Sequence, residues 1–308
     1  MTTDYARLID AETWAFINRI NAFYPPETAN LPIERNREIY DRMSRAFHTA
    51  YPAGVSAQAG TVPLADHDVA LRIYRKAGGP EAAVVLYFHG GGFILGGLDS
   101  HDDICADICA GTGAIVISVD YRLAPEHPGA AAFDDAVAAF EWVGANYPQP
   151  IVLVGESAGG NLAACVAHHT RGHALAAIGQ VLIYPGLGGD EGQGSYVTHA
   201  EAPMLSTRDL DFYRAVRTGE ANVSDDPRYT PLADNDFSEL PPTVIFTAQC
   251  DPLSSDGEAY RDRLLRGGGK ARWQEEEALP HGYLRARHTV GRARASFARI
   301  VEAIGMLG

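Results

Sequence analysis

The stretch IVLVGESAGGNLAACVAHH, residues 151–169, decides the fold of this chain of 308 residues. Its first four residues form an apolar run typical of a buried strand, and residues 158–171 resemble a helix. Between them lies a G-x-S-x-G motif, whose sharp turn holds the serine in strained backbone geometry. Glycines at 155 and 159 remove side chains that would clash in such a turn. The motif therefore predicts that Ser157 projects above the edge of a sheet.

Strand-like and helix-like segments alternate along most of the chain. Residues 69–74 alternate in polarity, and continuous apolar runs occupy 82–88, 113–119, 151–155, 178–184 and 243–248, with a last, more exposed strand at 273–280. Helix-like segments occupy 99–110, 130–146, 158–171, 254–266 and 283–305. This order predicts an α/β fold, a mostly parallel central sheet with helices on both faces.

Two regions do not follow this alternation. Helical periodicity at 4–20 and 33–48 precedes the first strand, and the Gly-, Asp- and Pro-rich region 187–242 has one predicted helix, at 207–218. Ligands bind at the carboxyl edge of open α/β sheets, so we expect both regions to form a helical cap there. The expected division is an N-terminal part of the cap at 1–50, a catalytic core at 51–186, a cap insertion at 187–242 and the rest of the core at 243–308.

A second glycine-rich motif, HGGGF at residues 89–93, directly follows the predicted strand 82–88. Its glycines leave backbone N–H groups uncovered, and acyl transfer needs such donors where the carbonyl oxygen becomes an oxyanion. We therefore expect the N–H groups of Gly91, Gly92 and Ala158 to form an oxyanion hole. Phosphate-binding loops also use glycine amides, but no Lys-Ser/Thr pair follows and the chain has no G-x-G-x-x-G motif.

A serine needs a base to accept its proton, and His281 is our candidate among eleven histidines. It lies in PHGY, a short loop after the last predicted strand, where the following glycine leaves the ring accessible. We interpret His89 as structural, holding the glycine loop by hydrogen bonds. His169 and His173 have metal-ligand spacing, but without an H-E-x-x-H motif a solvated helix end is favoured. We expect no metal and no cofactor.

An acid must orient the base and stabilise its charged form, and Asp251 follows the predicted strand 243–248 at the carboxyl edge of the sheet. Asp256 is the alternative, but it lies in the next helical turn, where a capping or supporting role is favoured. The order Ser157, Asp251, His281 is the order in which α/β-hydrolases carry their catalytic residues. The sequence thus predicts a hydrolase with a Ser-His-Asp triad.

Composition excludes several other classes of protein. Lysine and arginine number 25 against 39 acidic residues, a net charge of −14, which disfavours binding to nucleic acid and to anionic membranes. No apolar run approaches the length of a membrane span. The first ten residues lack the apolar region of a secretory signal, and four cysteines are too few for a disulfide scaffold. We therefore expect a cytoplasmic enzyme.

These motifs together resemble the bacterial hormone-sensitive-lipase-like carboxylesterases, a branch of the α/β-hydrolase superfamily. Besides HGGGF, the resemblance covers DYRLAPEHP at 120–128, GESAGGN at 155–161, YP at 184–185, CDPL at 250–253 and HGY at 281–283. It implies a serine carboxylesterase that prefers short acyl chains, a small-molecule ester as substrate, a two-part cap, no cofactor, and a homodimer as one oligomeric state. Glu156 stands where many members carry Asp.

Other functions remain open at this point. An amidase, an arylformamidase or a lactonase would use the same triad, because the shapes of cap and pocket set the substrate. A ligand receptor on this fold would be expected to lack the base or the nucleophile, and here all three residues are present. For the substrate pocket we expect Phe93, Glu156 and Met204, with Tyr5, Trp14 and Phe16 contributed by the cap.

Overall fold

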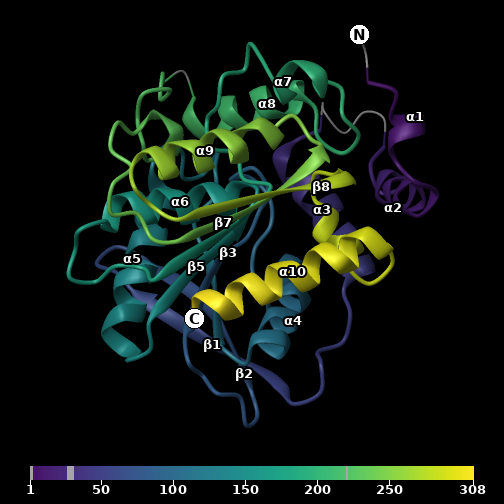
Figure 1. Cartoon of the computed structure of the whole chain (residues 1–308). Coiled ribbons are helices and arrows are strands. Elements are labelled where there is room, and N and C mark those ends of the chain that lie inside the picture. The colour runs from purple at the N-terminus through teal and green to yellow at the C-terminus, as the bar shows by residue number, and fades with distance from the viewer. Residues whose placement is uncertain (1–2, 26–30, 220) are drawn as a thin grey trace.

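A single twisted sheet organises the computed structural model, which describes residues 3–25, 31–219 and 221–308 (Figure 1). Its eight strands are β1 (Val55–Pro63), β2 (Asp68–Lys76), β3 (Val84–Phe88), β4 (Ile115–Asp120), β5 (Ile151–Glu156), β6 (Gly179–Ile183), β7 (Thr243–Cys250) and β8 (Ala271–Pro280). Their spatial order is β1-β2-β4-β3-β5-β6-β7-β8. The pairs β1–β2 and β2–β4 are antiparallel, and all the others are parallel.

The central strands are apolar without interruption because both faces of the sheet are covered. In β3, Val85 and Tyr87 belong to one core cluster, whereas Val84, Leu86 and Phe88 belong to the other. Side chains alternate between the two faces of a strand, so a continuous apolar run supplies both cores at once. All seven predicted strands are present, which confirms the mostly parallel sheet.

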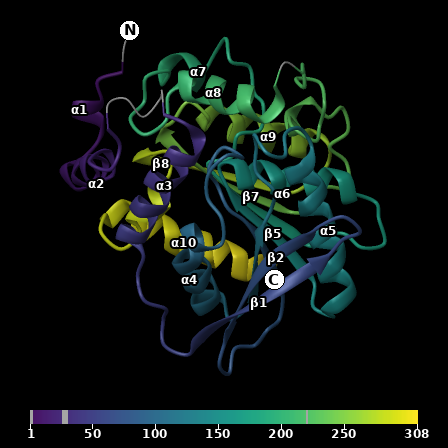
Figure 2. The same cartoon turned by 180° about the vertical axis from the view of Figure 1, so that it is seen from behind.

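Helices cover both faces of the sheet, as Figures 1 and 2 show. One core cluster contains residues of α4 (Asp102–Thr112) and α10 (Gly291–Leu307). The other contains residues of α5 (Ala131–Asn146), α6 (Ala158–Thr170) and α9 (Ser254–Arg266). Short 3-10 helices precede α4 at Asp99–His101 and α10 at Tyr283–Ala286, and a third spans Pro231–Ala233. The prediction of helices on both faces is confirmed.

The predicted elements are wrong in three places. The segment 4–20 is two helices, α1 (Tyr5–Leu8) and α2 (Ala11–Asn21), because the side chain of Asp10 accepts the N–H of Thr13 and starts a new helix. The segment 283–305 is also divided, since Val290 is extended and α10 begins only at Gly291. Strand β1 was missed because it is a largely exposed edge strand of small and polar residues.

The two regions assigned to a cap lie near the carboxyl ends of the parallel strands (Figure 1). The N-terminal region contains α1, α2 and α3 (Ile33–Phe47), and residues 187–242 contain α7 (Ser195–Thr198) and α8 (Thr207–Thr218). Tyr5 and His199 join the two regions by a hydrogen bond of 3.0 Å. Residues 1–2, 26–30 and 220 fall in these predicted regions but lie outside the described residues.

Candidate active site

Ser157 occupies the sharp turn that the G-x-S-x-G motif predicts. Strand β5 ends at Glu156 and α6 begins at Ala158, which leaves the serine alone between them with φ 55° and ψ −120°. A Cβ on Gly155 would meet the carbonyl oxygen of Gly159 at 2.1 Å, and one on Gly159 would meet that of Phe88 at 1.9 Å. The packing therefore requires glycine at both positions, and it fixes the backbone of Ser157.

Three side chains that are far apart in the sequence form a hydrogen-bonded row. His281 Nε2 lies 2.8 Å from Ser157 Oγ, and His281 Nδ1 lies 2.6 Å from Asp251 Oδ2. A carboxylate can only accept, so Nδ1–H donates to Asp251 and Nε2 accepts from the serine hydroxyl. Asp251 directly follows β7 and His281 directly follows β8, so all three residues lie at one edge of the sheet.

The surroundings of His281 adjust its basicity. Burial lowers the pKa of the imidazole, but the negative charge and hydrogen bond of Asp251 outweigh burial and raise it above its ordinary value of 6.5. Asp251 is fully buried and also accepts the N–H of Leu253 at 2.9 Å. The ring lies beside Tyr184, with centroids 4.8 Å apart. The arrangement holds the imidazole in one orientation and one tautomer.

Asp256, the alternative acid, is used differently. It is fully buried, and its carboxylate accepts the backbone N–H groups of Leu187, Gly188 and Gly189 at 2.6–3.2 Å and the hydroxyl of Tyr196 at 3.1 Å. Burial raises its pKa to about 7, against the effect of these donors. Asp256 therefore anchors the start of the inserted region and does not contact His281.

The glycine loop after β3 carries backbone donors beside the serine. Gly91 and Gly92 have φ values of +120° and +63°, and a Cβ on Gly91 would meet the carbonyl oxygen of Leu95 at 2.2 Å. In the described part of the chain, the N–H groups of Gly91, Gly92 and Ala158 donate to no protein acceptor. Such uncovered donors can bind an oxygen of a ligand.

A buried carboxylate holds this loop in place. Glu156 Oε1 accepts the N–H of Gly90 at 2.6 Å and lies 2.7 Å from His101 Nε2. Burial alone would raise the pKa of Glu156, but its contact with His101 holds it at about 2, so Glu156 remains an acceptor. Burial lowers the pKa of His101, although the neighbouring charge of Glu156 acts in the opposite direction. Sequence reasoning missed His101. Its neighbours Ser100 and Asp102 are polar as well, so nothing in the local sequence distinguishes it.

His89 lies behind the same loop. It is fully buried, its ring is stacked on Tyr121 with centroids 4.3 Å apart, and its Nδ1 donates to the carbonyl oxygen of Gly90 at 2.7 Å. Burial lowers its pKa to about 3, so the ring is neutral at physiological pH. The hydroxyl of Tyr121 donates to the carbonyl oxygen of His89 at 2.7 Å. These contacts agree with the structural role expected for His89.

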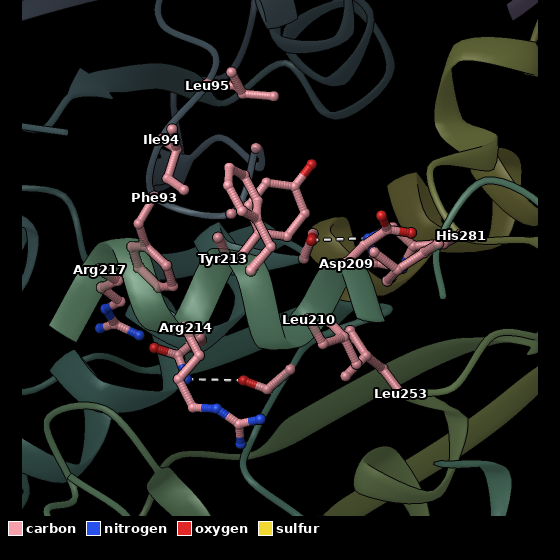
Figure 3. Close-up of a pocket in the computed structure, with 18 of the residues that line it drawn as sticks. Phe93, Ile94, Leu95, Asp209, Leu210, Tyr213, Arg214, Arg217, Leu253 and His281 are labelled. Carbon is pink, nitrogen blue, oxygen red and sulfur yellow. Dashed lines mark hydrogen bonds between the residues drawn. The ribbon is translucent and has the colours of Figure 1, made fainter. Parts of the chain in front are cut away.

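Ser157 and His281 open onto a large cavity of about 1420 Å³ (Figure 3). The three pocket residues expected from the sequence, Phe93, Glu156 and Met204, line it. The N-terminal contributions were wrong, since Tyr5, Trp14 and Phe16 are not among the described lining residues. Phe16 packs against Phe47 in the core instead, and the N-terminal residues that do line the cavity are Ile20, Asn21, Tyr24, Ile33, Asn36, Tyr40 and Met43.

Other polar groups suggested by the sequence lie away from this row. His169 and His173 contact each other edge to face, with ring centroids 5.9 Å apart. Across residues 3–25, 31–219 and 221–308, no cluster of three His, Cys, Asp or Glu side chains is arranged to hold a metal ion. In the same residues, no helix combines the length and apolarity needed to cross a membrane.

Comparison with known proteins agrees with the observed fold. A family model described as alpha/beta hydrolase fold matches residues 85–285. The carboxylesterase NlhH of Mycobacterium tuberculosis is 38% identical over 71% of this chain and 74% of its own. The ethyl acetate hydrolase of Pseudomonas putida is 32% identical over 77% and 78%. A hyperthermophilic esterase from the archaeon Pyrobaculum calidifontis, 29% identical, superposes with a TM-score of 0.90 over 97% of this chain and 99% of its own.

The chain belongs to the α/β-hydrolase family. Its relatives and structural neighbours are esterases, which confirms the hormone-sensitive-lipase-like branch and an enzyme of the carboxylic ester hydrolase class. The fold predicted from the sequence is confirmed as well.

Proposed function

We propose that this protein is a serine carboxylesterase that cleaves short-acyl esters through an acyl-enzyme on Ser157. The observation that carries the proposal is the position of His281, within hydrogen-bond distance of both Ser157 Oγ and Asp251. Proton transfer from a serine requires one ring nitrogen to accept from the hydroxyl and the other to donate to an acid, and the two ring nitrogens of His281 have these partners.

In the first half-reaction, Ser157 Oγ attacks the ester carbonyl carbon and His281 Nε2 takes the hydroxyl proton. The carbonyl electron pair moves to its oxygen, where the N–H groups of Gly91, Gly92 and Ala158 stabilise the negative charge. Asp251 stabilises the imidazolium without taking its proton. The tetrahedral intermediate then collapses, and His281 returns the proton to the departing alcohol.

In the second half-reaction, a water molecule attacks the acyl-enzyme and His281 takes one of its protons. The same amides hold the second oxyanion, the carboxylic acid leaves, and Ser157 regains its hydrogen from His281. Water supplies the atoms that the products gain, so the reaction needs no metal and no cofactor. Glu156 acts indirectly, because it holds Gly90 and thereby the direction of the two following amides.

The name of one relative supports a short acyl group: it is an ethyl acetate hydrolase, and it is 32% identical over 77% of this chain. We also propose that residues 1–50 and 187–242 form the two parts of a cap around 51–186 and 243–308. The hydrogen bond between Tyr5 and His199 supports a joint role for the two regions. A cytoplasmic location, no binding of nucleic acid and formation of a homodimer remain predictions.

A series of p-nitrophenyl esters from acetate to dodecanoate tests this function. We expect the highest kcat/KM at two to six acyl carbons, and a loss of kcat by about 10⁵- to 10⁶-fold in Ser157→Ala with an unchanged melting temperature. Matched amides and lactones are measured beside the esters. Turnover that survives in Ser157→Ala would refute this nucleophile, and faster cleavage of an amide or lactone would assign the triad to those substrates.

A further inference from the structure

Arg217, on the cap helix α8, is a buried guanidinium without a counter-charge. The residue is only 8% exposed, and its Nε and Nη2 atoms have no hydrogen-bond partner in the described structure. None of the ion pairs found within residues 3–25, 31–219 and 221–308 includes it. Asp226 is the acid that interacts with it electrostatically, and this carboxylate is bound by Arg228 at 2.7 Å.

Aromatic rings hold the guanidinium but leave its donors unused. Its central carbon lies 3.4 Å from the ring centroid of Phe93 and 4.8 Å from that of Tyr229. Stacking on a ring face recovers part of the cost of burying a cation. It does not satisfy the N–H groups, because these lie in the plane of the guanidinium and point sideways. An unsatisfied buried donor is costly, so Arg217 is prepared for an acceptor that it lacks.

The same guanidinium lines the cavity that contains Ser157. The residue that it covers, Phe93, directly follows Gly92 of the glycine loop. Helix α8 directs one face into the cavity, and Figure 3 shows Leu210, Tyr213 and Arg217 on it. A Cβ on Gly92 would meet the ring of Tyr213 at 2.4 Å, so this helix packs directly on the loop.

Most of the other charges along this wall already have partners; the exception among the described residues is Arg208, an exposed arginine of α8 that also lines the cavity. Arg214 pairs with Glu191 and Asp211, and Asp209 accepts the N–H and hydroxyl of Ser206. Arg285 donates to the hydroxyl of Tyr40 and to the carbonyl oxygen of Ser100. Among the described residues, Arg217 is therefore the buried cation of this wall that has no acidic partner, and it lies at the Phe93 end of the cavity.

We infer that Arg217 recognises a carboxylate carried by the substrate, so that the natural ester is a half-ester of a dicarboxylic acid or an ester of a hydroxy acid. A guanidinium binds a carboxylate by two parallel N–H···O bonds, which matches the unused donors of Arg217. In a chain with a net charge of −14, this one site would admit an anion that the rest of the surface repels. The inference rests on the proposed ester hydrolysis and specifies its substrate.

Matched substrate pairs test the inference. The acyl side is probed with p-nitrophenyl hemisuccinate, hemiglutarate and hemiadipate, each compared with its neutral methyl diester analogue. The alcohol side is probed with the acetyl esters of 3- and 4-hydroxybenzoate. Each is compared with the acetyl ester of the corresponding hydroxybenzamide, which is neutral. We expect the wild type to prefer the carboxylate on one side by about 10- to 100-fold in kcat/KM, with an optimum at one chain length.

Arg217→Gln should remove this preference mainly through KM, and change kcat/KM for the neutral esters much less. Arg217→Lys keeps the charge without the planar pair of donors and should retain only part of the preference. Arg214→Gln is the matched control, an arginine of the same helix that also lines the cavity but already has carboxylate partners. It should keep the preference.

Binding measured without turnover separates this inference from the proposed function. In Ser157→Ala, glutarate or hydroxybenzoate at millimolar concentration should raise the melting temperature, and the added substitution Arg217→Gln should abolish this shift. If neutral esters are cleaved with no preference for a carboxylate and Arg217→Gln changes no ratio, the inference is wrong and the esterase stands. If no ester is cleaved but the shift depends on Arg217, the anion site stands without the esterase.

Discussion

The sheet edge and helix α8 line the same cavity, but their buried charged groups differ: those at the edge have partners, and the one on α8 has no acidic partner. At the edge of the sheet, the two buried carboxylates beside the serine have partners: Asp251 pairs with His281, and Glu156 with Gly90 and His101. On α8, the buried Arg217 is held between aromatic rings and has no acceptor. The carboxylates at the edge therefore have their partners before substrate arrives, whereas α8 carries a buried charged group that a substrate can satisfy. On our proposals, the ester bond is cleaved at the first region and the substrate is selected at the second.

Of the variants that test this comparison, Asp251→Asn should have the largest effect, because it removes the charge that pairs with His281. An amide at this position removes the charge and favours the wrong tautomer of His281, so we expect kcat to fall about 10³- to 10⁴-fold. Asp256→Asn is the matched control. Asp256 is also a buried aspartate and lies in the first turn of α9, but it binds Leu187 and Tyr196 of the inserted region and not His281. Steady-state kinetics of both variants would decide, and a greater loss in Asp256→Asn would reverse the assignment of the acid.

Arg287→Met and Arg217→Met compare a paired with an unpaired buried arginine. Arg287 is 2% exposed and binds Asp103 and Asp107 at 2.6 and 2.7 Å, so its loss removes the arginine partner of two carboxylates at once. We expect a cost of about 3–5 kcal/mol in the free energy of unfolding. Arg217→Met should cost less than about 1 kcal/mol or stabilise the fold, since it removes an unpaired charge. Urea denaturation measures both, and equal losses would contradict the comparison.

Glu156→Gln should weaken catalysis through the glycine loop and not through substrate binding. Without its charge, the side chain holds the N–H of Gly90 less firmly, and a small displacement of the following amides is costly in the transition state. We expect kcat to fall by about 10- to 100-fold while KM changes little. Glu156→Asp, the residue that many related esterases carry, should recover part of the rate. A change confined to KM would instead make Glu156 a substrate-contacting residue.

The smallest effect concerns pH. Catalysis needs neutral His281, and Asp251 raises the pKa of that imidazole above 6.5, so kcat/KM should fall as the pH drops through this raised pKa. The contribution of the charged pair to stability has the opposite sign: it is present below pH 6.5 and is lost as the pH rises through the folded pKa. In Asp251→Asn the acidic limb should move to lower pH. A rate that stays constant down to pH 5 would argue against an imidazole base.

Sequence reasoning could select candidate residues where their placement depends on local geometry. Ser157 could be recognised because a strand, a turn that only glycine permits and a helix follow one another within a few residues. Asp251 and His281 could be chosen because each directly follows a strand, and parallel strands bring their carboxyl ends to one edge. The same reasoning could not reach His101, whose partner Glu156 lies 55 positions further along the chain.

The amino-acid sequence by itself determined the alternation of strands and helices, the elbow at Ser157 and the catalytic class, because apolar periodicity and glycine act over short distances. Only the tertiary structure decided which helix faces which loop. It buried Arg217 against Phe93, set Asp256 under the inserted region and turned Phe16 away from the cavity. Such contacts join residues 31 to 124 positions apart, and their energy depends on burial and on the partners present, which no local pattern records.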